Sequence, residues 1–139
     1  MFRQILVPTD FSKKHVTPLE IATNLAEKHN STIHLLHVIE IIPDTDFKEF
    51  EDFYNELKKR AQKQMNSLLS KYKSKSLQIA THTSYGNRVQ EILKFMKQHE
   101  IDLIIMNSHK VELKNPVHGW GTISYKIALL SESPVMLVK

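Results

Sequence analysis

Short apolar runs alternate with segments of helical spacing along the whole chain, and this order constrains the fold more than any other feature. Short runs of this kind that end at turn-forming residues are typical of β-strands. Continuously apolar runs are typical of strands buried on both faces, as in a parallel sheet. The five runs occupy residues 5–7, 32–39, 77–83, 103–106 and 134–138.

The segments between these runs have the apolar spacing of amphipathic helices. The first contains Thr17–Glu20, which resembles a capping box with proline at the first helical position, although Ser12 is a competing start. The second is expected from about Thr45 to Lys73, and the third around residues 89–96. The last is expected from Thr122 to about Ser131, with its inward positions at Ile123, Ile127 and Leu130.

Strict alternation of strands and helices implies right-handed crossovers and a parallel sheet with helices on both faces. The chain has 139 residues, which is the size of one ordinary domain. We therefore expect a single α/β domain over residues 1–139.

Composition narrows the function classes. The chain has no cysteine, which excludes disulfides, thiolate nucleophiles and cysteine-built metal sites. Its start lacks the apolar stretch of a signal peptide and no window reaches the length of a membrane span, so we expect a cytoplasmic protein. The net charge is +4, and the lysines gather in residues 58–75. A solvated helix face explains them better than a nucleic-acid surface.

The sequence places polar residues where a ligand site is expected. In an open parallel sheet, ligands bind beyond the carboxyl ends of the strands. That position selects residues 8–12, 38–40 and 106–124. The last stretch ends in Gly121-Thr122 at a helix start, with Ser124 just beyond. Backbone N–H groups and hydroxyls there predict an anion site suited to phosphate, with an ordinary N-cap at Thr122 as the alternative.

Five segments, taken in order, resemble the universal stress protein family over the whole chain. No segment is specific alone, but their order is. The matching segments are Ile5–Ser12, Leu35–Val38, Gly86–Ile92, Asp102–Met106 and Ser133–Val138.

The resemblance implies a five-stranded sheet of order 3-2-1-4-5 and a homodimer formed through the final strand, residues 134–138. It also implies a site for ATP or AMP, with Mg²⁺ only alongside ATP. Asp10 would accept from ribose hydroxyls, unless it only caps the turn that follows it. The adenine and ribose contacts would fall on Pro8, Thr9, Asp10 and Val38. The phosphate contacts would fall on Met106, Asn107, Ser108, Lys110, Gly121, Thr122, Ile123 and Ser124.

The phosphate loop departs from the family pattern of glycine, two residues, glycine, nine residues, then glycine and serine or threonine. Asn107 and Lys110 stand where the first two glycines belong, and ten residues separate Lys110 from Gly121. Asparagine tolerates a positive φ, whereas lysine cannot copy the close backbone approach of glycine. A nucleotide-independent interaction module with the same fold is therefore the alternative function.

Other candidate sites are weaker. His34 and His37 are three residues apart on a predicted strand, so they should face opposite sides, and His109 and His118 share a loop without a carboxylate cluster. We therefore expect no metal site, and we expect Trp120 to pack onto the fold. No phosphate-binding lysine loop, nucleophile elbow or catalytic triad is present. The sequence therefore predicts slow ATP hydrolysis at most.

Overall fold

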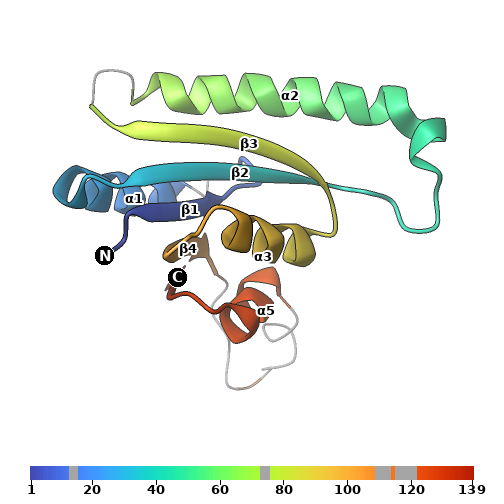
Figure 1. The fold of residues 1–139 in the computed structure, drawn as a ribbon. Coiled ribbons are helices and arrows are strands. Elements are labelled where there is room, and N and C mark those ends of the chain that lie inside the picture. Colours follow the sequence, from blue (N-terminus) through green and yellow to red (C-terminus); the bar gives the residue numbers. More distant parts are fainter. Residues whose placement is uncertain (13–15, 73–75, 109–113, 115–121) are drawn as a thin grey trace.

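A computed structural model describes residues 1–12, 16–72, 76–108, 114 and 122–139, and every structural statement below concerns those residues. Five parallel strands form one sheet in the order β3-β2-β1-β4-β5, as predicted (Figure 1). The strands are β1 (Gln4–Pro8), β2 (Thr32–Glu40), β3 (Gln78–Gly86), β4 (Leu103–Asn107) and β5 (Val135–Val138).

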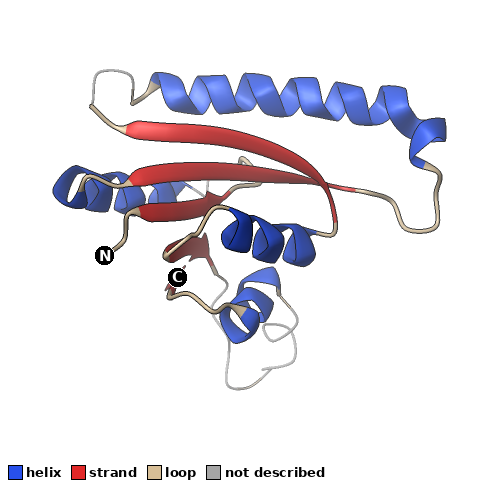
Figure 2. Ribbon diagram, in the orientation of Figure 1, coloured by secondary structure: helices blue, strands red, loops and turns tan. Residues whose placement is uncertain are grey.

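Helices cover both faces of the sheet, which gives the predicted three-layer α/β architecture (Figure 2). Alternate residues of β1 show this division: Ile5 and Val7 pack with the α1 and α2 layer, and Leu6 packs with the α3 and α5 layer. The helices are α1 (Val16–His29), α2 (Glu51–Ser70), α3 (Arg88–Gln98) and α5 (Ile123–Leu130).

The strand order reverses beside β1, which pairs with β2 on one side and with β4 on the other. The helix that follows β1, α1, lies on one face of the sheet, and the helix that follows β4, α5, lies on the opposite face. The carboxyl ends of β1 and β4 therefore diverge into different layers, which is where an open parallel sheet holds its ligands.

Two helix starts differ from the sequence prediction. Helix α1 already includes Val16, so the expected capping box is wrong and Pro18 is the third helical residue. Proline is tolerated there because the first turn has no intrahelical acceptor for its missing N–H. The segment expected to be helical from Thr45 begins instead as a 3₁₀ turn, η2 (Phe47–Phe50), with Asp46 as its N-cap.

The predicted inward face of the last helix is correct only in part. Ile127 is fully buried, whereas Leu130 is 60% exposed, so its predicted inward orientation is wrong. Helix α5 lies beside the edge strand β5, and the sheet ends there, so its final turn has no strand to cover. The opposite orientations of His34 and His37 are confirmed: His34 contacts Phe95 of α3, and His37 contacts Phe11 on the other face.

Candidate functional site

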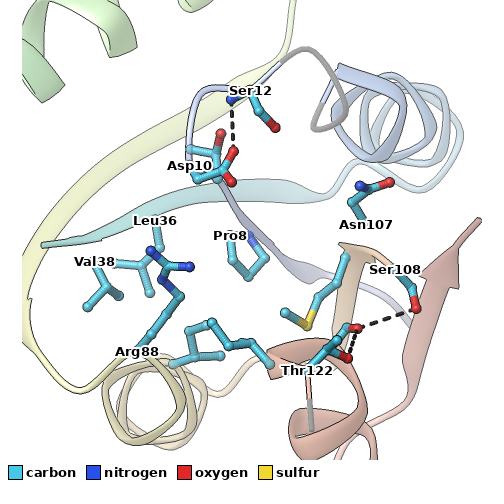
Figure 3. Close-up of a pocket in the computed structure, with 14 residues that line it drawn as sticks. Pro8, Asp10, Ser12, Leu36, Val38, Arg88, Asn107, Ser108 and Thr122 are labelled. Atoms are coloured by element: carbon cyan, nitrogen blue, oxygen red, sulfur yellow. Dashed lines mark hydrogen bonds between the residues drawn. The ribbon is translucent and has the colours of Figure 1, made fainter. Parts of the chain in front are cut away.

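A cavity of about 500 Å³ lies at the carboxyl ends of β1 and β4, between the turn after β1 and the starts of α3 and α5 (Figure 3). Five segments far apart in the sequence contribute to its lining. Its lining comprises Pro8, Thr9, Asp10, Ser12, Leu36, Val38, Arg88, Ile92, Met106, Asn107, Ser108, Thr122, Ile123 and Ser124.

The turn after β1 forms one wall of the cavity. The backbone N–H of Thr9 donates to the Leu36 carbonyl at 2.8 Å, which extends the β1–β2 ladder by one residue. Phe11 then adopts a left-handed φ of 65°, and its N–H donates to Thr9 Oγ1 at 3.0 Å. Asp10 Oδ1 accepts from the Ser12 N–H at 2.8 Å, so this carboxylate does cap the turn, as the alternative interpretation expects.

His37 holds the base of this turn from the layer behind the cavity. Its Nδ1 donates to the Thr9 carbonyl oxygen at 2.8 Å. Burial lowers the pKa of His37, the hydrogen bond to Thr9 opposes that change, Arg88 lowers the pKa further and Asp10 raises it. The ring therefore favours its neutral form, and it braces the Thr9 carbonyl without adding a positive charge behind Asp10.

A row of hydroxyls forms the opposite wall. Ser124 Oγ donates to Ser108 Oγ at 3.3 Å, and Thr122 Oγ1 lies 3.3 Å from Ser124 Oγ (Figure 3). Thr122 occupies the N-cap position of α5, but its side chain makes no capping hydrogen bond to the helix. The hydroxyls of β4 and of the α5 start therefore form one connected polar surface.

Asn107 replaces the first glycine of the family's phosphate loop, and the backbone there is regular strand. Asn107 is the last residue of β4 and pairs in register with Val138 of β5. Its φ is not positive. The backbone here does not need the conformational freedom of glycine, so asparagine costs nothing in backbone strain at this position.

Ten of the twelve predicted site residues line this one cavity, and the other two, Lys110 and Gly121, lie outside the described residues. His109, His118 and Trp120 also lie outside them. The ten comprise Pro8, Thr9, Asp10, Val38, Met106, Asn107, Ser108, Thr122, Ile123 and Ser124.

Sequence reasoning missed three lining residues, Leu36, Arg88 and Ile92; a fourth, Ser12, lies in the predicted stretch 8–12 but was not named as a ligand contact. Arg88 matters most because it brings a positive charge to the cavity. It is the first residue of α3, and its Nε lies 3.6 Å from Glu40 Oε1 at the end of β2. The signal was available, since a helix that follows β3 begins at the same sheet edge as the residues after β1 and β4.

A family model described as the universal stress protein family matches residues 1–139 of this chain. The chain belongs to the universal stress protein family. A curated relative, universal stress protein YxiE of Bacillus subtilis (strain 168), is 28% identical over 153 residues that cover all of both chains.

Solved structures support the same fold. Universal stress protein UspA from Lactobacillus plantarum superposes with a TM-score of 0.80 at 23% identity, over 99% of this chain and 98% of that one. The universal stress protein from Archaeoglobus fulgidus in complex with dAMP superposes with a TM-score of 0.69 at 15% identity, over all of both chains.

None of the helices described is long and apolar enough to cross a membrane. Within the same residues, no group of three histidine, cysteine, aspartate or glutamate side chains is arranged to hold a metal ion.

Proposed function

We propose that this universal stress protein is a regulatory protein that binds AMP or ATP in the cavity between β1 and β4. The observation that carries the proposal is the meeting of the Pro8–Asp10 turn, the β4 end at Ser108 and the α5 start at Thr122 around one cavity. A volume of about 500 Å³ falls within the range of about 300–1,000 Å³ typical of small-molecule sites.

The chemistry of the lining supports a ligand with an apolar base and an anionic tail. Leu36, Val38 and Ile92 give an apolar wall near one end, and three hydroxyls line the other. The solved relative from Archaeoglobus fulgidus holds dAMP, an adenine nucleotide of this kind. A planar base fits the apolar wall, and a phosphate fits the hydroxyls at the helix start.

Individual roles follow from position. Asp10 Oδ1 is committed to the Ser12 N–H, and a carboxylate offers several further acceptor positions, so it can still accept from a ribose hydroxyl. Ser108, Thr122 and Ser124 would donate to phosphate oxygens. Mg²⁺ would enter only with ATP, because Asp10 is the one carboxylate among the described lining residues.

Isothermal titration of the purified protein with AMP and with ATP tests the proposal. We expect saturable binding with one nucleotide per chain. Hydrogen bonds to charged groups contribute about 1.5–3 kcal/mol, so Ser124→Ala should weaken AMP binding by about 10-fold or more. Ser70→Ala, at an exposed residue of α2 that does not line the cavity, is the matched control and should bind like the wild type.

The absence of saturable binding at millimolar AMP and ATP would remove this function. It would favour the nucleotide-independent interaction module, for which the loop substitutions at Asn107 and Lys110 give the specific motive. A folded protein must be shown in the same sample by circular dichroism, so that loss of structure is not mistaken for loss of a site.

We also propose a homodimer formed by pairing two β5 strands. The carbonyls of Pro134, just before β5, and Val138 accept from the N–H groups of Ile104 of β4 and Ser108, which follows β4, so the backbone polar groups of the even-numbered residues point toward β4. The N–H groups of Val135 and Leu137 therefore point to the open edge of the sheet. An exposed strand edge favours pairing with another chain, and two-fold pairing would satisfy both copies.

Light scattering on a sizing column tests the dimer. The wild type should elute as a dimer at about 100 µM, and Leu137→Pro, which removes one edge N–H, should shift it toward monomer while the helical signal is kept. A wild-type monomer at that concentration would contradict the dimer. A cytoplasmic location remains our expectation, and fractionation of cells expressing the chain checks it.

A further inference from the structure

The side chain of Lys139 lies directly behind the hydroxyl row of the cavity. Lys139 follows β5, whose last paired residue, Val138, lies in register with Asn107. Its Nζ donates to Ser108 Oγ at 3.4 Å, and Ser108 also accepts from Ser124. A positive charge is thus one hydrogen bond away from a side chain that lines the cavity.

Tyr125 fixes the position of that ammonium group. Lys139 Nζ donates to Tyr125 Oη at 2.5 Å and lies 4.8 Å from the centre of the ring. The hydrogen bond from Lys139, followed by one from Ser108, lowers the pKa of the Tyr125 phenol. Lys139, Tyr125 and Ser108 therefore form one hydrogen-bonded group beside the start of α5.

The charge of Lys139 reaches the cavity through two buried hydroxyls. Lys139 itself is exposed, but Ser108 and Ser124 are only 7% and 4% exposed, so water is largely excluded from the hydroxyl row that the ammonium group contacts. A hydroxyl that accepts a hydrogen bond from a cation becomes a stronger donor, because a chain of hydrogen bonds polarises its members. A phosphate at the hydroxyl row would experience both effects.

We propose that Lys139 is a positioning residue that makes the cavity select nucleoside phosphates over uncharged nucleosides. This inference rests on the proposed function. It adds Lys139, which follows β5, to the residues that determine which ligand the cavity prefers. The charge acts through Ser108 on the anionic part of the ligand. The base and the sugar, which lie toward the apolar wall, do not depend on it.

The experiment measures binding of AMP and adenosine to the wild type and to Lys139→Met. We expect AMP to bind Lys139→Met about 5-fold or more weakly, because a charge-assisted donor is lost, while adenosine changes by less than about 2-fold. Lys139→Arg keeps a charged donor and should restore most of the preference for AMP. Lys126→Met, which removes an exposed cation from α5 next to Tyr125, is the matched control and should bind both ligands like the wild type.

A second readout is independent of the ligand. In Lys139→Met the pKa of Tyr125 should rise, because the donor that lowers it is gone, and absorbance titration against Tyr125→Phe isolates this phenol. Equal losses of AMP and adenosine affinity, or an unchanged AMP affinity, would overturn the inference while the proposed function stands. Failure of the wild type to bind AMP at all would overturn both.

Discussion

Acidification should destabilise this protein through a cluster of imidazoles on the α3 face of the sheet. The rings of His34 of β2, His82 of β3 and His99 form a triangle: the His34 centroid lies 5.3 Å from His82 and 5.5 Å from His99, and those two lie 5.1 Å apart. Phe95 closes the cluster from α3. His34 Nε2 donates to Gln4 Oε1 at 2.7 Å, so its Nδ1, 3.1 Å from His82 Nε2, must accept in the neutral ring. A proton on His34 Nδ1 would face the donor of His82.

The size of the effect follows from the lowered pKa. Burial first, then His82 and His99, lower the pKa of His34 from 6.5 to about 4. The folded state therefore takes up this proton later than the unfolded chain, so stability is fully present above about pH 6.5 and is lost as pH falls toward 4. The full linkage is about 3 kcal/mol, and screening of a half-buried ring reduces it to about 1–2 kcal/mol.

Urea unfolding followed by circular dichroism at pH 7 and pH 4.5 measures this contribution. His34→Gln removes the ring, so the variant should lose about 1–2 kcal/mol less than the wild type between the two pH values. His29→Gln, an exposed histidine at the end of α1, is the matched control and should keep the wild-type dependence. Equal losses in the wild type and in His34→Gln would refute the reasoning.

Two backbone and core positions give further predictions. Gly86→Ala should lower the free energy of unfolding, measured in urea, by about 1–3 kcal/mol. Gly86 has a φ of +144°, and a Cβ there would lie 2.9 Å from Glu91 Oε1. An unchanged stability would contradict the strain argument. Tyr54→Phe should lower the free energy of unfolding by about 1–3 kcal/mol in the same measurement. Tyr54 is fully buried, and its Oη accepts from the Ile42 N–H at 2.9 Å. An unchanged stability would show that the Ile42 amide is satisfied without this hydrogen bond.

The strands were predictable because their signal is local. Runs such as Leu103–Met106 are apolar at every position, and burial on both faces of a parallel sheet produces that pattern directly. The strand order was not derivable from periodicity, and the family resemblance supplied it. Helix ends were the weakest part: the 3₁₀ turn at Phe47–Phe50 depends on the Asp46 cap, which the apolar spacing does not reveal.

The site was predictable as far as its residues follow β1 and β4 in the sequence. Arg88 and Ile92 were missed because the prediction considered only residues in or directly after β1, β2 and β4, whereas these two enter the cavity from α3, which follows β3 and starts at the same sheet edge. The exposure of Leu130 was missed for a related reason, since helical spacing does not show where a sheet ends. The role of Asp10 in its turn was foreseen, because aspartate often caps the residues that follow it.

Amide chemical-shift mapping of AMP on the ¹⁵N-labelled protein tests the central claim most directly. The largest shifts should fall together on residues 9–12, 106–108 and 122–124, because these segments line one cavity. Shifts confined to another surface, such as the outer face of α2, or to only one of the three segments, would show that they do not form a common nucleotide site.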